Sequence, residues 1–177
     1  MLDLDLTIYN YRCFSDRLPA RISIRRGNTA LIGLNNAGKS TLLRFFYEFR
    51  NLFAHLGAYL EGNLNGAAKA FGQLQGVRDN AEVFCNLNNR NIRIEIEWVD
   101  AGGAKHLVSI EVTRSLGWTA TMSNPVDLKE LGESLLQLSR TLYVGAFRNA
   151  INQGGLENYY DIQIGGNFVT GWRRQKL

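Results

Sequence analysis

A GxxxxGK[ST] pattern at residues 33–40 constrains the fold of this 177-residue chain more than any other feature, and it reads Gly-Leu-Asn-Asn-Ala-Gly-Lys-Ser. A short apolar run precedes the pattern and a helical periodicity follows it. Glycines at both ends let the backbone wrap closely around an anion, with N–H groups pointing inward and a helix N-terminus behind them. A chance match in a chain of this composition has a probability of about one in two hundred. The pattern therefore predicts a strand–loop–helix unit that binds phosphate.

The side chains of this loop have separate expected roles. Lys39 is expected to reach the β- and γ-phosphates of a nucleotide, the Ser40 hydroxyl to ligate Mg²⁺, and Thr41 to bond a more distant phosphate oxygen. ATP and Mg²⁺ are therefore the expected ligands. The alternative is a glycine-rich turn that binds nothing. The expected nucleotide-binding residues of the loop are Gly33, Asn35, Asn36, Ala37, Gly38, Lys39, Ser40 and Thr41.

Periodicity divides the rest of the chain. Alternating apolar and polar residues predict strands that each bury one face, and an apolar run between turn signals predicts a strand buried on both faces just before the loop. The half-buried strands are expected at 4–11, 20–25, 92–98, 108–112 and 118–122, and the buried strands at 29–32 and 142–146.

Two segments show a helical period. A helix from Lys39 is expected to bury Leu42, Phe45, Phe46, Phe49, Phe53 and Leu56, and a second one at 127–140 to bury Leu128, Leu131, Leu135 and Leu138. Residues 57–91 have a weak period and predict a loop or an irregular helical insert. His55, on the apolar face of the first helix, and His106, at a strand start, have no cysteine or carboxylate at ligand spacing, so no metal site is predicted there.

Composition excludes several classes of protein. Hydrophobic residues make up 45% of the chain and charged residues 20%, which is typical of a globular protein. No apolar run approaches the ~20 residues that span a bilayer, and the start of the chain lacks the pattern of a secretory signal. Cys13 and Cys85 have no CxxC spacing, which favours a protein of the reducing cytoplasm. No association with a membrane is expected. The net charge of +4 leaves nucleic-acid contact open.

Two segments together resemble a known family. Residues 6–14 read Leu-Thr-Ile-Tyr-Asn-Tyr-Arg-Cys-Phe, and residues 31–43 read Leu-Ile-Gly-Leu-Asn-Asn-Ala-Gly-Lys-Ser-Thr-Leu-Leu. They are similar to the L-x-I-x-N-[FY]-[RK] opening motif and the G-x-N-x-[AS]-G-K-S loop of ABC-type ATPases of the SMC, RecF and OLD group. The Asn-Asn-Ala-Gly-Lys-Ser form looks most similar to the OLD-like, defence-associated branch. The specific part of the match ends within the first helix.

The resemblance implies a fold and further site residues. The fold would be α/β, a P-loop NTPase of ABC-ATPase type with a mixed sheet and an antiparallel β meander around the P-loop helix. Arg12 would lie near the nucleotide. The strand at 142–146 would lead to the Q-loop, where Gln153 is a candidate Mg²⁺ ligand and Arg148 could face phosphate instead. The whole of 1–177 would be an N-terminal lobe, divided into 1–56, 57–91, 92–140 and a Q-loop-like tail at 141–177.

Two elements of that family are missing from the sequence. No two acidic residues are adjacent, although hydrolysis needs an acidic pair to hold Mg²⁺ and activate water, and no Ser-Gly-Gly signature is present. No catalytic residue is therefore assigned, and the chain is expected to be truncated, with the C-terminal lobe or the rest of the same ATPase as its complement. Whether this chain is an enzyme by itself stays open.

Two functions are compatible with the sequence. The first is an ATP-driven switch on DNA-associated or anti-phage defence machinery, which would form a head-to-tail homodimer and work with DNA and a nuclease partner. The alternative is a nucleotide-sensing interaction module that binds ATP without hydrolysing it. A small P-loop kinase fits poorly, because its dense parallel sheet would not give alternating strands. The aromatic and basic residues at 172–176 could stack on bases or dock on the missing lobe.

Overall fold

The computed structural model describes residues 2–27, 30–34, 37–62, 69–75, 77, 80–123 and 128–141. The chain divides into two compact units, Met1–Arg140 and Thr141–Leu177, and nearly all described residues belong to the first. Its elements are β1 (Leu4–Tyr9), β2 (Ala20–Ile24), α1 (Lys39–Glu48), α2 (Arg50–Gly62), β3 (Lys69–Gln73), α3 (Asn80–Val83), β4 (Ile92–Val99), β5 (Lys105–Val112), β6 (Gly117–Ser123) and α4 (Leu128–Ser139).

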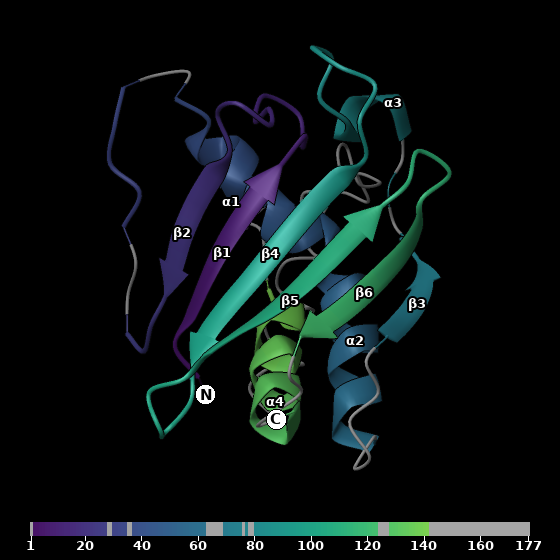
Figure 1. Cartoon of the computed structure of the whole chain (residues 1–177). Coiled ribbons are helices and arrows are strands. Elements are labelled where there is room, and N and C mark those ends of the chain that lie inside the picture. Colours follow the sequence, from purple (N-terminus) through teal and green to yellow (C-terminus); the bar gives the residue numbers. More distant parts are fainter. Residues whose placement is uncertain are drawn as a thin grey trace, which may run out of the picture. The chain divides into compact units, whose positions relative to one another are not determined.

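Six strands form one sheet in the order β2-β1-β4-β5-β6-β3 (Figure 1). Five of these strands lie where alternation predicts them, and β1 ends at Tyr9 because Asn10 turns the chain with a φ of 58°. Every pairing between the described strands is antiparallel. The prediction of a mixed sheet is therefore wrong for this part of the chain. Residues 100–104 join β4 to β5, and residues 113–116 join β5 to β6. Turns this short connect antiparallel neighbours only, because a connection between parallel strands needs about a dozen residues or more.

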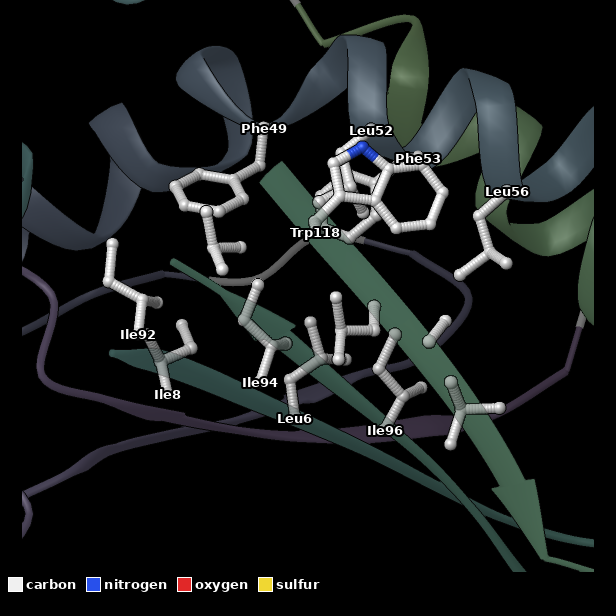
Figure 2. Close-up of a cluster of buried hydrophobic side chains, with 14 of the residues drawn as sticks. Leu6, Ile8, Phe49, Leu52, Phe53, Leu56, Ile92, Ile94, Ile96 and Trp118 are labelled. Atoms are coloured by element: carbon white, nitrogen blue, oxygen red, sulfur yellow. The ribbon is translucent and has the colours of Figure 1, made fainter. Parts of the chain in front are cut away.

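The helices α1, α2 and α4 lie on one face of this sheet, as Figure 1 shows. The register places Leu6 opposite Ile96 and Ile8 opposite Ile94, so that the apolar side chains of neighbouring strands share the helix-facing side. Figure 2 shows these side chains beneath the apolar face of the helices. Each fully buried side chain of this size contributes about 1.5–3 kcal/mol relative to its exposed state. The sheet and the helices are held together mainly by this layer.

The predicted first helix is two helices that share one apolar face. All six residues of the predicted stripe are buried, which confirms the period. The chain bends at Phe49, whose backbone leaves the helical region with φ −93° and ψ 4°. Backbone bonds from Phe49 N to Phe45 O and from Phe53 N to Phe49 O cross the bend, so the turn is tight and the apolar face continues from α1 into α2.

Helices α2 and α4 approach each other through two glycines. A Cβ placed on Gly57 would lie 2.9 Å from the carbonyl oxygen of Gly132, and a Cβ on Gly132 would lie 2.9 Å from that of Gly57. Leu131 and Leu135, which belong to the predicted apolar face of α4, are fully buried. Glycine at both crossing positions lets the backbones come this close.

The prediction of a buried strand at 29–32 is wrong for its described part. Residues 30–32 are not in a strand, and the side chains of Ile32 and Leu34 are 93% and 85% exposed. An apolar run is buried as a central strand only when neighbouring strands pair with it and cover both faces. None of the six strands of the described sheet pairs with this segment.

The prediction of a loop or an irregular helical insert at 57–91 agrees with the end of α2 and the short helix α3, but it is wrong for the edge strand β3. The sequence of β3 shows little of the alternation of apolar and polar residues that predicts a strand. β3 pairs with β6, where Gly72 lies opposite Trp118, and a Cβ on Gly72 would lie 2.6 Å from the indole ring. The bulky indole therefore fills the space over the glycine, and the strand depends on its partner for packing.

The described helices give no candidate for a membrane span, since none combines the necessary length with the necessary apolar character. The predicted strand at 142–146 lies outside the described residues.

Candidate functional site

The side chain of Lys39 folds back over the beginning of the loop. Its Nζ donates to the carbonyl oxygens of Gly33 at 2.7 Å and of Leu34 at 2.5 Å. A lysine ammonium has three N–H donors. The two carbonyls fix the direction of the ammonium group, and the described residues supply no partner for its third donor. The positive charge is thus held at the loop, with one donor that no described residue uses and that could bond a phosphate oxygen.

The N-terminus of α1 is open toward the same loop. Gly38 is the N-cap residue, no described side chain caps the helix, and the first turn holds no acidic residue. The helix begins with a bond from Leu42 N to Gly38 O. The backbone N–H groups that precede Leu42 in the helix have no intrahelical acceptor, and they form the positive end of the helix dipole. An anion at the helix N-terminus would be stabilised by hydrogen bonds from these N–H groups and by the helix dipole.

Gly38 occupies a position that requires glycine. Its φ is +83°, and a Cβ there would lie 2.8 Å from Cε1 of Phe14 and 3.4 Å from Sγ of Cys13. The turn that follows β1 therefore contacts the loop directly, with the Phe14 ring against the backbone of Gly38. The position of Phe14 was not predicted from the sequence.

The hydroxyl residues of the loop lie in the first turn of α1. Ser40 is exposed and Thr41 is partly buried. Mg²⁺ takes six oxygen ligands and usually keeps several waters while it bridges to substrate phosphates. One serine hydroxyl next to a bound phosphate suits this chemistry, and the role of Ser40 as a Mg²⁺ ligand stays a prediction.

Arg12, which the resemblance places near the nucleotide, has a protein partner in this structure. Its Nη2 bonds Glu48 Oε1 at 2.5 Å, and its Nη1 lies 3.8 Å from Glu82 Oε2. The residue is in the left-handed region with a φ of 50°, and its N–H donates to the carbonyl of Val83 at 3.0 Å. The guanidinium is therefore held on the last residue of α1, and contact between Arg12 and a nucleotide stays a prediction.

Glu48 also accepts a hydrogen bond from the buried phenol of Tyr11, at 2.7 Å. Burial and the nearby carboxylate of Glu48 both raise the pKa of the Tyr11 phenol well above its ordinary value. Burial is the largest single effect on the Arg12 guanidinium and would lower its pKa, but the hydrogen bonds and charge interactions with Glu48 and Tyr11 together outweigh burial, and the pKa is raised. Tyr11 stays neutral and Arg12 stays charged at any physiological pH.

Some predicted residues lie outside the described part of the chain. They are Asn35 and Asn36 of the loop, Gln153 and Arg148 of the expected Q-loop, and the basic residues at 172–176.

The described residues contain no group of three histidine, cysteine or acidic side chains that could hold a metal ion. His55, which the sequence placed on the apolar face of the first helix, is exposed. The buried His106 does have a carboxylate partner, since its Nε2 donates to Asp100 Oδ2 at 2.9 Å across the β4–β5 turn. Its ring also stacks on Trp98. This pair stabilises the hairpin.

Sequence reasoning missed Glu48 as part of the site. One signal was present, because an acidic residue lies inside the run Phe45-Phe46-Tyr47-Glu48-Phe49, on a helix with a broad apolar face. A carboxylate in such a position needs a buried partner. The partners are Tyr11 and Arg12 of the opening motif, and Arg44 one helical turn earlier, whose Nε lies 3.9 Å from Glu48 Oε1.

No protein-family model and no curated protein matches this chain. Among solved structures, one similar chain is described by the words "Structural biochemistry of ATP-driven dimerization and DNA stimulated activation of SMC ATPases". It is 14% identical, the alignment covers 100% of this chain and 97% of that chain, and the TM-score is 0.46. A likeness this weak supports no statement about function.

Proposed function

We propose that this chain is the nucleotide-binding lobe of an ABC-type ATPase of the SMC/RecF group, and that it binds ATP with Mg²⁺ at residues 33–41. The observation that carries the proposal is the position of Lys39, whose ammonium is held by the carbonyls of Gly33 and Leu34 beside an uncapped helix N-terminus. A charged donor and a set of free backbone N–H groups that converge on one loop are suited to a polyphosphate.

Each loop residue would have its own role in binding ATP and Mg²⁺. Gly38 would allow close approach of the backbone, Lys39 would contact the β- and γ-phosphates, and Ser40 would ligate Mg²⁺. Bound Mg²⁺ would neutralise charge on the phosphates. Asn35, Asn36, Ala37 and Thr41 would complete the loop.

The biological role that we propose rests on the resemblance of the opening motif and the loop. The chain would work in the cytoplasm with the rest of its ATPase and pair head-to-tail with a second copy, as an ATP-driven switch on DNA-associated machinery. The narrower version is an OLD-like ATPase of anti-phage defence with a nuclease partner.

The second candidate is a module that binds ATP without hydrolysing it. The sequence has no adjacent acidic pair, and the one buried carboxylate of α1, Glu48, is occupied by Tyr11 and Arg12. If this candidate is right, the isolated chain will release phosphate from ATP no faster than a Lys39→Ala variant does.

The binding experiment is isothermal titration calorimetry with ATP and Mg²⁺. Wild-type protein should bind, and Lys39→Ala should lose about 10–100-fold in affinity, because a charge-assisted hydrogen bond contributes about 1.5–3 kcal/mol. The control is Lys69→Ala, which removes an exposed lysine on the edge strand β3. Absence of binding at millimolar ATP, or equal loss in both variants, would refute the proposal.

A further inference from the structure

The carboxylate of Glu48 binds two consecutive residues of the turn that follows β1. Tyr11 donates to one oxygen at 2.7 Å and Arg12 to the other at 2.5 Å. Glu48 is only 9% exposed, and it is the last residue of α1. This end of the helix is therefore fixed to the turn by two hydrogen bonds, one of them an ion pair.

The same turn reaches the opposite end of α1. The ring of Phe14 and the sulfur of Cys13 lie against Gly38, the N-cap residue. The ten residues of α1 span about 15 Å. Residues 11–14 thus contact the helix at both of its ends.

Aromatic rings connect these two contacts. The ring of Tyr11 lies 6.5 Å from that of Phe14, and it meets Phe45 and Phe49 edge-on at 5.4 and 5.7 Å. Tyr11 is fully buried. The row of rings leaves no space for α1 to slide relative to the turn.

This attachment matters because no described strand pairs with the segment before the loop, of which Leu31 is partly buried against the core. Residues 30–34 pair with no described strand, and Ile32 is 93% exposed. The direction of the N–H groups at the start of α1 is then set by what holds the helix. In this structure the buried apolar layer holds the middle of α1, and the turn at 11–14 contacts both of its ends.

We propose that Glu48 is a positioning residue for the phosphate loop, which it aligns through Tyr11 and Arg12 without touching the nucleotide. The inference rests on the proposed function, because it assigns a role in ATP binding at that same loop. When the carboxylate is lost, the turn loosens from α1, and the contact of Phe14 with Gly38 becomes less well defined. The loop N–H groups and Lys39 are then less well arranged for phosphate.

The test variant is Glu48→Gln, which keeps the size of the side chain and an acceptor for Tyr11 but removes the charge that faces Arg12 and, at 3.9 Å, Arg44 of the same helix. We expect the Kd for ATP with Mg²⁺ to rise about tenfold, which is about 1.4 kcal/mol of binding free energy. Tyr11→Phe removes only the phenol oxygen and should weaken binding in the same direction by a smaller factor.

Two controls separate positioning from general stability. Asp16→Asn breaks the ion pair of Asp16 with Arg90. Asp16 belongs to the same β1–β2 connection as residues 11–14, and its hydrogen bonds and ion pair among the described residues go to Asn88 and Arg90, not to α1. Gly132→Ala is expected to destabilise the fold at the crossing of α2 and α4, away from the loop. Both should bind ATP as wild-type protein does, under conditions in which all variants are folded.

A second measurement needs no nucleotide. Amide NMR spectra of Glu48→Gln should show shifts at Gly38, Lys39 and Ser40, which lie two to three turns from the substitution. Unchanged amides there, or a Kd equal to that of the two controls, would overturn the inference. If wild-type protein fails to bind ATP, the proposed function fails, and the amide shifts alone then decide whether Glu48 positions the loop.

Discussion

Replacing Gly132 by alanine should push α2 and α4 apart. The added methyl group would lie 2.9 Å from the carbonyl oxygen of Gly57 and 3.2 Å from the amide nitrogen of Glu61. Both are backbone atoms of a helix, so neither can move aside without moving the helix. Overpacking of this kind costs about 1–3 kcal/mol, and we take the upper end because the neighbours are rigid. Alanine in a helix gains about 1 kcal/mol over glycine.

The net expectation is a loss of about 2 kcal/mol in the free energy of unfolding, which lowers Tm by about 4–8 °C in a chain of this size. The assay is urea and thermal unfolding followed by circular dichroism. Both measurements should give the same order of variants if unfolding is two-state.

Two other glycines serve as matched controls. Gly62 ends α2, with nothing within 4 Å of an added Cβ and no positive φ, so Gly62→Ala should be neutral or stabilising by up to about 1 kcal/mol. Gly103 has equally open space but a φ of +85°, and Gly103→Ala should cost about 1–2 kcal/mol from backbone strain alone. If Gly132→Ala unfolds at the same urea concentration as Gly62→Ala, the close approach of α2 and α4 does not exist in solution.

Two further predictions concern a thiol and a carboxylate. A thiol reagent should modify the exposed Cys13 and spare the buried Cys85. ATP with Mg²⁺ should slow the modification of Cys13, because its sulfur lies beside Gly38. Equal rates with and without ATP would contradict this. The hydrogen bonds from His106 and from the amide of Ala104 hold the pKa of Asp100 below 3.8, so its stabilising effect is present above that pH and is lost as the pH falls further. The Tm of Asp100→Asn should lie below that of wild-type protein at pH 6, and the difference in Tm should shrink below pH 3.8. A difference in Tm that stays constant between pH 6 and pH 3 would contradict the pairing of Asp100 with His106.

Much of the sheet could be predicted from alternation, because β4, β5 and β6 each carry a full apolar face and are joined by short turns. β3 could not, since Gly72 supplies no side chain and the strand is completed by Trp118 from β6. The segment at 30–32 shows the opposite failure. Its apolar residues carry a strand signal, but burial of such a run is decided by neighbouring strands, which the segment itself does not encode.

For the site, the spacing of glycines and lysine predicted a loop at the start of a helix, and the structure places Lys39 and Gly38 there. The partner of Arg12 could not be predicted from the motif. Which acidic residue receives the guanidinium depends on how α1 is rotated about its axis, and this rotation is set by the packing of Tyr11 among the phenylalanines.

The strand order has a consequence for synthesis on the ribosome. β1 and β2 emerge first and can pair as a hairpin, but β1 lies inside the sheet and its second neighbour, β4, is translated much later. Until β4 arrives, the backbone edge of β1 that pairs with β4 stays unpaired on a nascent chain. β4, β5 and β6 are adjacent in sequence and can form a meander quickly once they have left the exit tunnel. Long-range pairing of β1 with this meander then ends the exposure of that edge, which is prone to aggregation as long as it is unpaired.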